Sequence, residues 1–515
     1  MTAVLDLPSE SVAVAPEPWR ARLQPLAGRG GWLASLAVTL LAGVLRFVRL
    51  DLPYNGSVGG KIFDEVYYAC DAQNLLRYGV EHVTASDSAN TRVAGACTPT
   101  GSGSFVVHPP LGKWAIALGE KLFGVTTFGW RFSAAVAGTL TVLIVVRVGR
   151  RMTGSTLLGC LAGLLVAVDG LHFVQSRVAM LDVFLVLWTT AGFACAVLDR
   201  DQLRARLAQG RGGGARWWLV AAGVCLGAAT ATKWSGAYYL AGIGLLVIVW
   251  EVGARRTAGG RAPFRETVRR STLTLAGSLT LLPLTVYLLW WTGWFLSDIG
   301  YDRHWADDQP TRFGFLPDAL RSLWHYHQQT LTFHEGLSTP HPYQSHAVGW
   351  LLLARPVSYY YPPGLTAPKY GCEVASCSRE VLALGNPVLW WGTVPVLVAL
   401  LWLWVARRDW RASTVLLMIA TGILPWVRDD LHERTMFNFY ALPAVPFMAL
   451  GAALVGGWLL GGREASRSRR RWGAAAVGTY AGLAVAAFAF FYPVLAAVTI
   501  PLSQWQDRMW LHSWV

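Results

Sequence analysis

The sequence predicts an all-α, polytopic membrane protein with about eleven transmembrane helices. Of its 515 residues, 54% are hydrophobic and only 14% are charged, which is too little charge to cover the surface of a soluble protein of this length. A run of roughly 17–25 apolar residues is long enough to cross a bilayer as a helix. Such runs lie near 31–49, 130–149, 154–171, 179–198, 216–232, 236–252, 272–292, 386–405, 411–427, 436–460 and 473–500.

Arginine-rich segments between these runs predict the orientation, because Lys and Arg concentrate in cytoplasmic loops. They precede the first run and follow the second, fourth, sixth, eighth and tenth, and contain Arg20, Arg22, Arg29, Arg147, Arg150, Arg151, residues 200–216 and 255–270, Arg407, Arg408, Arg411 and residues 463–471. All lie on one side, so we expect a cytoplasmic N-terminus and an external C-terminus. The formal charge of +14 then reflects membrane topology, and the expected anionic partner is a phospholipid surface or a lipid-linked phosphate, not nucleic acid.

We expect one integral membrane domain over 31–505, with a cytoplasmic tail at 1–30 and an external tail at 506–515. The first 30 residues hold no apolar run, so no cleavable signal peptide is expected and the first helix acts as an uncleaved anchor. The long connections 51–129 and 293–385 both fall on the external side and contain Trp, Tyr, Pro and His instead of Gly/Ser repeats, which predicts an external working surface. Trp505, Trp510 and Trp514 predict an interfacial belt.

The cysteines fall into two groups. Three lie inside apolar runs and are expected to pack as small apolar side chains: Cys160, Cys195 and Cys225. Four lie in the external connections: Cys70, Cys97, Cys372 and Cys377. An even number in an oxidising compartment permits two disulfides, Cys372 with its near neighbour Cys377 and Cys70 with Cys97, and free thiols are the alternative.

Two short motifs in the first connection contain candidate functional residues. Asp64 and Glu65 begin a helix expected to end near Arg77 and Gly79; the alternative is a solvated acidic helix start. His108 and Lys113, around two prolines, precede a short amphipathic helix whose N-terminus could meet a phosphate. The alternative for the second motif is an interfacial helix with a snorkelling lysine.

Charged side chains also recur at the expected external ends of the helices, against the positive-inside bias. They are Arg131, Asp169, Arg177, Asp182, Lys233 and Arg434, the last followed by Asn438 and Tyr440. Ionisable residues near the hydrocarbon need partners and are functional candidates. An external phosphate would account for the cations, and ion pairs with Asp169 or Asp182 are the alternative.

An external carboxylate together with external cations suits one reaction type. When a hydroxyl attacks C1 of a glycosyl phosphate, the leaving phosphate is a stable anion that cations stabilise. The attacking hydroxyl needs a general base, and a carboxylate can serve as one. A single displacement predicts inversion at the anomeric carbon.

Several stretches together resemble the protein O-mannosyltransferases, a branch of the GT-C membrane glycosyltransferases. They are Phe-Asp-Glu-Val-Tyr-Tyr at 63–68, His-Pro-Pro-Leu-Gly-Lys at 108–113, Ser-Arg-Val-Ala-Met-Leu-Asp at 176–182, Thr-Lys-Trp-Ser-Gly at 232–236, His-Pro-Tyr-Gln-Ser at 341–345, Arg-Pro-Val at 355–357, three tyrosines at 359–361 and the segment 434–443. The resemblance implies the GT-C fold, a polyprenyl-phosphate mannose donor, and Ser/Thr acceptors in exported proteins.

The resemblance also implies roles for the candidates. Asp64 is the expected base, with Glu65 beside it in the acidic pair. Donor and phosphate contacts are expected from Arg131, Arg177, Lys113, His108, Lys233, Arg434 and Tyr440, and the further site candidates are Asp182, Asn438 and His341. Asp64, Glu65 and Asp182 could supply oxygen ligands to a divalent ion, but a metal-free reaction without a further cofactor is expected.

The second connection departs from the eukaryotic family pattern, because its roughly 90 residues show no inserted β-trefoil domain. This suggests a bacterial member at the plasma membrane with its active site facing outside, and the Ala, Gly and Arg content suggests an actinobacterium. Association with the protein export channel stays open. The alternatives are a related GT-C enzyme that modifies a lipid or a cell-wall glycan, and a transporter of lipid-linked sugars, which the lack of an internal repeat disfavours.

Overall fold

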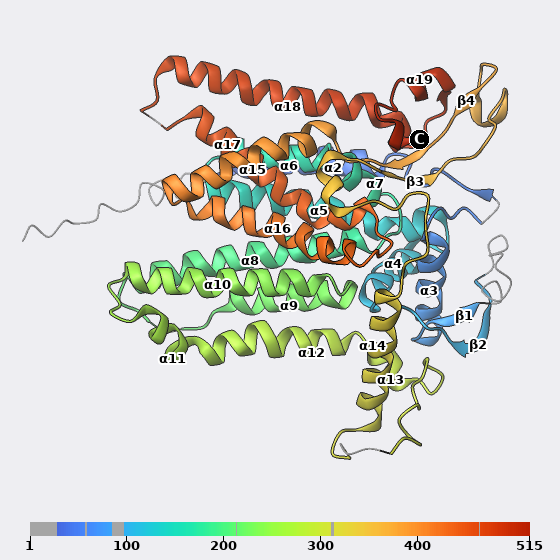
Figure 1. Cartoon of the computed structure of the whole chain (residues 1–515), viewed down its shortest axis with the longest axis horizontal. Helices are drawn as coiled ribbons and strands as arrows, with labels where there is room; N and C mark the ends of the chain where they lie inside the picture. The colour runs from blue at the N-terminus through green and yellow to red at the C-terminus, as the bar shows by residue number, and fades with distance from the viewer. Residues whose placement is uncertain (1–27, 57–58, 85–96, 213, 311–313, 463) are drawn as a thin grey trace, which may run out of the picture.

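The computed structural model describes residues 28–56, 59–84, 97–212, 214–310, 314–462 and 464–515. In these residues, long helices lie side by side, and short helices, strands and loops cap one end (Figure 1). The long helices are α2 (Arg29–Phe47), α5 (Thr127–Thr153), α6 (Thr156–Ala167), α8 (Asp182–Ala208), α9 (Trp217–Thr232), α10 (Gly236–Thr257), α11 (Pro263–Ala276) continued by η4 (Gly277–Leu281) and α12 (Leu282–Leu289), α15 (Pro387–Arg407), α16 (Trp410–Asp430), α17 (Val445–Leu460) and α18 (Arg467–Leu495). Most of the predicted tail at 1–30, with Arg20 and Arg22, lies outside the described residues.

Each predicted apolar run coincides with one of these helices. Nine helical segments of the described chain are long and apolar enough to cross a membrane. The two remaining expected spans, α6 and α9, are shorter apolar helices of 12 and 16 residues. The multi-pass, all-α architecture is confirmed, whereas the exact number of crossings and the orientation of the termini stay predictions.

Helix boundaries follow local signals in the sequence. α5 begins after Thr126, whose hydroxyl accepts a hydrogen bond of 3.0 Å from the Gly129 amide, and it ends at Gly154 in the left-handed conformation (φ 68°). α15 begins after Asn386, whose side-chain oxygen accepts from the Val388 amide at 3.0 Å, with Pro387 in the first turn.

The two long connections and the C-terminus lie at the same end of the helix bundle (Figure 1). The first connection contributes α3 (Glu65–Tyr78), β1 (His82–Thr84), β2 (Pro99–Gly103) and α4 (Leu111–Phe123). The second contributes α13 (Thr292–Leu296), α14 (Asp318–Glu335), η5 (Ala347–Leu352), β3 (Val357–Tyr360), η6 (Lys369–Gly371), β4 (Cys377–Ser378) and β5 (Val381–Ala383). The remaining short elements are α7 (Gly170–Gln175), η7 (Asn438–Ala444), β6 (Ile500–Pro501), α19 (Leu502–Gln506) and η8 (His512–Trp514).

Three two-stranded antiparallel sheets fasten this end together: β1 with β2, β3 with β5, and β4 with β6. Because β6 lies after α18, the last pairing ties the C-terminal segment to the second connection. Trp514 is 3% exposed and donates to the Leu353 carbonyl at 2.7 Å, whereas Trp510 stays 47% exposed. Trp514 therefore anchors the chain end instead of facing lipid headgroups, unlike the expected belt.

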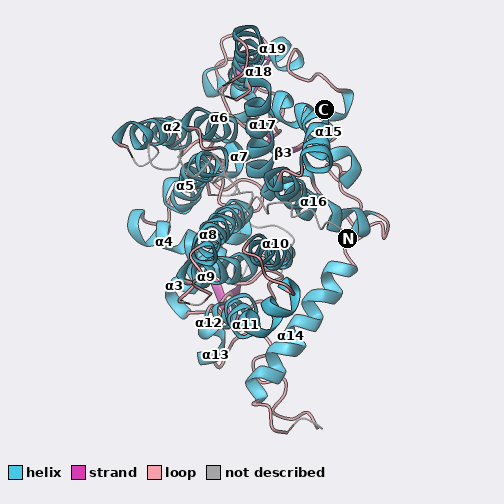
Figure 2. Cartoon of the chain, turned by 90° about the vertical axis from the view of Figure 1, so that its left-hand side faces the viewer, coloured by secondary structure: helices cyan, strands magenta, loops and turns pink. Residues whose placement is uncertain are grey.

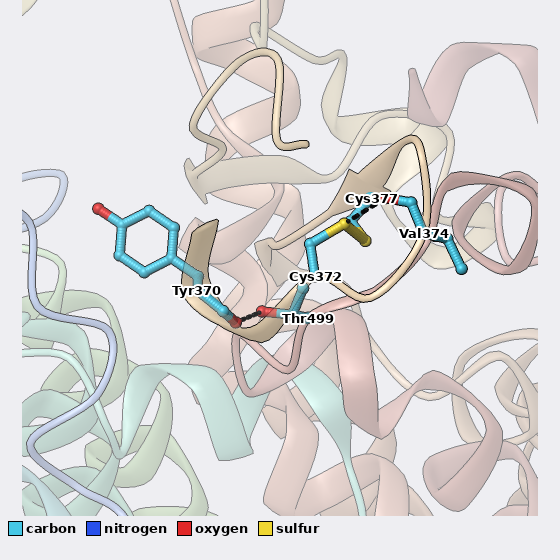
Figure 3. The surroundings of a disulfide bond; sticks show 5 residues. All are labelled: Tyr370, Cys372, Val374, Cys377 and Thr499. Carbon is cyan, nitrogen blue, oxygen red and sulfur yellow. Dashed lines mark hydrogen bonds between the residues drawn. A yellow bond between two sulfur atoms is a disulfide. The ribbon is translucent and has the colours of Figure 1, made fainter. Parts of the chain in front are cut away.

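Both expected disulfides are present. Cys70 in α3 is bonded to Cys97, and Cys372 is bonded to Cys377 beside β4 (Figure 3). In the same close-up the Thr499 hydroxyl donates to the Tyr370 carbonyl at 2.8 Å, which adds a contact between the C-terminal segment and this turn. The cysteines inside the helices, Cys160, Cys195 and Cys225, are free.

A buried ion network lies at the opposite end of the bundle. Arg216 bonds Asp199 through Nη2 at 2.5 Å and Glu251 through Nη1 at 2.6 Å, and Arg255 bonds Glu251 at 2.7 Å. Ser271 donates to the same Glu251 carboxylate. Buried charges are costly unless paired, and here they join α8, α9, α10 and α11. In Figure 2, α11 and α12 stand at the edge of the bundle beside α9 and α10.

Candidate active site

The start of α3 is fixed by a strained turn and by contacts from distant segments. Phe63 adopts a left-handed backbone conformation (φ 47°), which is uncommon for a bulky residue. Its ring stacks on Tyr359 of β3, with centroids 4.1 Å apart. The Tyr359 hydroxyl in turn accepts a hydrogen bond of 2.7 Å from the Gln175 side chain of α7. The second connection and α7 thus hold the turn that precedes Asp64.

The two adjacent carboxylates of this motif point into different surroundings. Glu65 is fully buried and receives Arg131 Nε at 2.6 Å and Nη2 at 2.8 Å. It also accepts the Ile62 amide at 2.9 Å and the Ala179 amide at 3.0 Å. Asp64 lines a large cavity at the end of the bundle. The pair therefore divides into one structural carboxylate and one that faces the cavity.

The Asp64 cavity has a volume of about 1000 Å³. Its lining includes Asp64, Tyr67, Tyr68 and Asp71, which lie three or four residues apart and hence on one face of α3. The opposite walls come from β1, from the segment 104–108 and from the end of α14. Burial raises the pKa of Tyr68, and the negative charge of Asp64 raises that pKa further.

A second cavity, the Arg434 cavity, has a volume of about 520 Å³ and lies at the ends of the membrane helices. Its cationic lining residues are Lys233, Arg428 and Arg434. Lys233 contacts both oxygens of Asp182 at 2.9 Å, and Arg434 bonds Asp429 at 2.7 Å. The Nε of Arg434 is buried and has no hydrogen-bond partner among the described residues.

The two cavities adjoin, because Val107, His108, Phe333 and Leu337 line both of them. The rings of His108 and His334 stack there with centroids 5.6 Å apart. Burial lowers the pKa of His334 to about 4, and the positive charge of Arg434 contributes. Burial likewise holds the pKa of His108 well below its usual value, with a contribution from Lys233. Both imidazoles are therefore neutral near pH 7.

An apolar groove of about 1190 Å³ continues from the Arg434 cavity along the membrane helices. It lies between α10 and the helix formed by α11, η4 and α12, with Leu245, Val268 and Leu284 among its lining residues. Trp234 and Tyr238 line both the groove and the Arg434 cavity. The groove therefore joins a lipid-exposed surface to a polar, cationic chamber.

Comparison with known proteins decides the family. Residues 94–295 match the family described as dolichyl-phosphate-mannose-protein mannosyltransferase, and residues 319–514 match the C-terminal four-transmembrane region of protein O-mannosyltransferase. The chain belongs to the protein O-mannosyltransferase family.

Relatives in this family resemble nearly the whole chain. A polyprenol-phosphate-mannose–protein mannosyltransferase of Mycobacterium tuberculosis is 39% identical, covering 99% of this chain and 97% of that protein. One from Corynebacterium glutamicum is 34% identical, covering 93% and 92%. The solved Saccharomyces cerevisiae Pmt1–Pmt2 complex bound to the sugar donor has a TM-score of 0.73 at 16% identity, covering 97% of this chain and 94% of that chain. The GT-C fold and the actinobacterial kinship expected from the sequence are thus confirmed.

Two of the arginines expected to contact the donor phosphate line neither of the two cavities. Arg131 has no exposed surface and is bound to Glu65 and to the Leu50 carbonyl. Arg177 is 5% exposed and donates to several carbonyls at the C-terminal end of α2, including those of Arg46 at 2.9 Å and Val48 at 2.7 Å. Both act as internal connectors, and neither lines the described cavities.

The other cations divide between the two cavities. Lys113 lines the Asp64 cavity, where it pairs with Glu81. Lys233, Arg434 and Tyr440 line the Arg434 cavity. The ion pair between Lys233 and Asp182, which was the alternative interpretation, is present, and it places Asp182 directly behind the cavity wall.

Two further candidates line neither of these cavities. Asn438 is fully buried and donates to the Ala383 carbonyl at 3.3 Å, joining η7 to β5. His341 is exposed and packs edge-on against Phe437, with centroids 5.0 Å apart. Asn438 therefore holds η7 against the strand that pairs with β3, and His341 packs on the segment that precedes η7.

Within the described residues, no group of three or more His, Cys, Asp or Glu side chains has the arrangement of a metal site. The oxygens of Glu65 are taken by Arg131 and backbone amides, and those of Asp182 by Lys233. The three carboxylates considered as metal ligands are therefore not assembled as a set.

Sequence reasoning missed three elements of this site: His334, Asp71 and the apolar groove. His334 comes from α14 and meets His108 from the first connection only through the tertiary fold. Asp71 had a detectable signal, because its spacing from Asp64 on a predicted helix places both on one face. The groove had no detectable signal in the sequence, because its lining residues have the same apolar pattern as a lipid-facing helix surface.

Proposed function

We propose that this protein transfers mannose from polyprenyl-phosphate mannose to Ser or Thr hydroxyls of exported polypeptides. The observation that carries the proposal is the junction of two cavities of opposite character at His108. One presents the Asp64 carboxylate, and the other presents Lys233 and Arg434 beside an apolar groove. The near full-length relatives named as polyprenol-phosphate-mannose–protein mannosyltransferases support this reaction.

The proposed donor site is the Arg434 cavity together with the apolar groove. The polyprenyl chain lies between α10 and α12, where hydrophobic lining favours an isoprenoid. The phosphate lies near Arg434, whose unpartnered Nε and forked guanidinium suit phosphate oxygens. Because Lys233 is already paired with Asp182, it contributes a weaker field than a lone lysine. The Lys233 ammonium lies 5.0 Å from the centroid of the Tyr440 ring, within cation–π distance, and this ring forms part of the wall of the Arg434 cavity.

The proposed chemistry places the acceptor on the other side of the junction. Asp64 accepts the proton from a Ser or Thr hydroxyl as that oxygen attacks C1 of mannose. The bond from C1 to the phosphate oxygen breaks, and the departing anion is stabilised by the cations of the Arg434 cavity. Attack from the face opposite the phosphate inverts the anomeric carbon, which gives an α-linked product from a β-linked donor.

Glu65 and Arg131 are proposed as positioning residues in this scheme. Their bidentate contact joins α3 to α5, and the Glu65 bond to the Ala179 amide adds the segment before α8. This fixes the first turn of α3 and therefore the direction in which Asp64 points. A buried bidentate pair is suited to this because its geometry is specific.

The proposed location is the bacterial plasma membrane, with the active site facing outside. Residues of the two long connections line both cavities. These connections lie at one end of the bundle, and the turns between α8 and α9, α10 and α11, and α15 and α16 lie at the other end (Figure 1). The positive-inside rule then assigns the cavities to the external face, where exported chains emerge.

The test is a transfer assay with the purified protein in lipid. It offers polyprenyl-phosphate mannose and a peptide rich in Ser, Thr and Pro, and it compares the wild type with Asp64→Asn. We expect mannosylated peptide from the wild type and essentially none from the variant. Donor binding without peptide modification would instead favour an enzyme that modifies a lipid or a cell-wall glycan. Failure to bind the donor would reject the proposed sugar or carrier.

A further inference from the structure

The first turn of α2 and the last turns of α5 meet at the end of the bundle that lies opposite to the two cavities. The two helices lie side by side and run in opposite directions (Figure 2). Arg131, near the start of α5, donates to the Leu50 carbonyl just after α2, whereas the guanidinium group of Arg150 lies against Gly31. A Cβ on Gly31 would collide with that guanidinium group, so glycine is required for this close approach.

Two arginines at this point of α5 have no acidic partner among the described residues. Arg150 is 3% exposed, and its Nε and Nη1 are buried without a hydrogen-bond partner. The Nη1 of Arg147, one turn earlier, is also buried without a partner. Their neighbour Arg151, by contrast, bonds Asp201 at 2.7 Å. A buried cation is costly unless it is paired, so an anion bound here would stabilise the packing of α2 on α5.

The start of α2 adds partial positive charge at the same place. The first amides of a helix have no intrahelical acceptor, and the helix dipole favours an anion beside them. The N-cap residue Gly28 provides no side-chain cap, and the first turn of this 19-residue helix contains no acidic residue. The space beside Gly30 is open, because a Cβ there would meet nothing within 4 Å. A ligand can therefore approach the first-turn amides next to the buried Arg150.

The surrounding side chains suit an anion that is carried by a lipid. The guanidinium carbon of Arg147 lies 3.7 Å from the centroid of the Trp32 ring, and this indole is 45% exposed, as is common at a membrane interface. Leu33, Leu36 and Leu40 are exposed and lie one above another along α2. The cationic end of this surface therefore continues into an apolar stripe that can accommodate an acyl chain.

We propose that the first turn of α2, together with Arg147 and Arg150, binds a phosphate group, and that an anionic phospholipid carries this group. The phosphate oxygens accept hydrogen bonds from the forked guanidinium groups and from the first-turn amides. Trp32 lies beside the headgroup, and an acyl chain lies along the leucines of α2. Basic pockets between membrane helices are typical sites for acidic lipid headgroups. This site is separate from the proposed donor site, because none of its residues lines the Arg434 cavity.

The experiment titrates the full-length protein, in a neutral detergent, with a fluorescent phosphatidylglycerol. We expect saturable binding that unlabelled phosphatidylglycerol displaces and that diacylglycerol, which lacks the phosphate, does not displace. Inorganic phosphate distinguishes the two possible sources of the group. It should compete only at much higher concentration, because it lacks the acyl contacts. Competition by inorganic phosphate at the same concentration as phosphatidylglycerol would overturn the assignment to a lipid and assign the site to free phosphate.

Two variants and a matched control complete the test. Arg147→Gln combined with Arg150→Gln should weaken phosphatidylglycerol binding about 10–100-fold, because two charge-assisted contacts are lost. Arg147→Gln alone alters only a half-buried side chain and should weaken binding about five-fold, which keeps the test decisive if the double variant does not fold.

The control is Arg265→Gln combined with Arg269→Gln. It removes the same charge from exposed positions of α11, which follows a turn at the same end of the bundle (Figure 1). Its affinity for phosphatidylglycerol should equal that of the wild type. Absence of saturable binding in the wild type, or wild-type affinity in Arg147→Gln, would overturn the inference. An equal loss of affinity in the control would also overturn it, because the attraction would then depend on net charge and not on this site.

Discussion

The Asp64 cavity and the Arg434 cavity share a wall at His108 but differ in origin and charge. The first is built by the extramembrane connections, with α3, β1 and the segment 104–108, and it carries a net excess of carboxylates among the described residues. The second is built largely where membrane helices end. Three cationic side chains and two carboxylates, Glu335 and Asp429, line it, and it opens into an apolar groove. In the proposed division of the reaction, loops shape the cavity assigned to the polypeptide acceptor, whereas helix ends shape the cavity assigned to the lipid-linked donor.

If the two cavities divide the reaction as proposed, variants on the two sides should fail in different ways. Asp64→Asn should lower kcat by about 10³-fold, because it removes the general base while keeping the side-chain volume. Donor affinity, measured by equilibrium binding of labelled polyprenyl-phosphate mannose, should change less than two-fold. A variant that kept near-normal turnover would remove Asp64 from the mechanism.

The Asp64 side also depends on a pair that never touches the cavity. Arg131→Met should destabilise the protein by about 3–5 kcal/mol, because it leaves the Glu65 charge buried and unpaired. Thermal unfolding in detergent measures this loss. The double variant Glu65→Gln with Arg131→Met should recover part of the stability. If Arg131→Met had the same thermal stability as the wild type but did not bind the donor, the arginine would instead be a phosphate ligand.

The cationic side should show the opposite kinetic pattern. Arg434→Met is expected to weaken donor binding about 10–100-fold, because it removes a charge-assisted contact to phosphate and frees the opposing Asp429 carboxylate. Arg434→Lys should weaken donor binding less, because lysine keeps the positive charge but lacks the forked N–H donors of the guanidinium group. The acceptor KM should stay nearly constant in both variants, and a rise in that KM alone would contradict the division between the cavities.

The groove can be tested by filling it from one helix. Gly244 lines the groove, and a Cβ there would meet nothing within 4 Å, so Gly244→Leu projects into its open space. The KM for a long-chain donor should rise about five- to ten-fold, while a donor with one or two isoprene units should be unaffected. Gly253→Leu, also on α10 and without neighbours within 4 Å but outside the groove lining, is the matched control.

The smallest expected effect concerns the histidines at the shared wall. Because the pKa of His334 is lowered to about 4 from the ordinary 6.5, this side chain is neutral through most of the useful pH range. Donor affinity should therefore stay flat between pH 5.5 and 8, as measured by binding. Below about pH 6.5 the unfolded chain binds a proton at this histidine that the folded chain does not bind. The free energy of unfolding should therefore decrease as pH falls from about 6.5 toward 4. Over this pH range, the Tm of His334→Gln should fall by about 2 °C less than the Tm of the wild type.

Much of the fold could be predicted from sequence because the signals are local. Apolar run length identified each long helix, and a short polar residue marks the start of α5 and of α15. The even cysteine count in the connections permitted both disulfides but left free thiols as an alternative, and the structure decided between them. The acidic motif at the start of α3 was also visible, because its residues are consecutive.

Tertiary structure alone decided which carboxylate of that motif is structural and which one faces the cavity. Asp64 and Glu65 are equivalent in local sequence, and only Arg131 from α5 together with the Ala179 amide before α8 makes one of them a buried structural carboxylate. Likewise, Arg131, Arg177 and Arg434 look alike as charges at helix ends, but the first two find internal acceptors and the third faces a cavity. Helix length and amphipathicity depend on neighbouring residues and can be read from one segment. The partner of a buried charge depends on how separate helices pack. The sequence therefore determined which charged side chains lie at the helix ends, and only the packed structure decided which of them line a cavity.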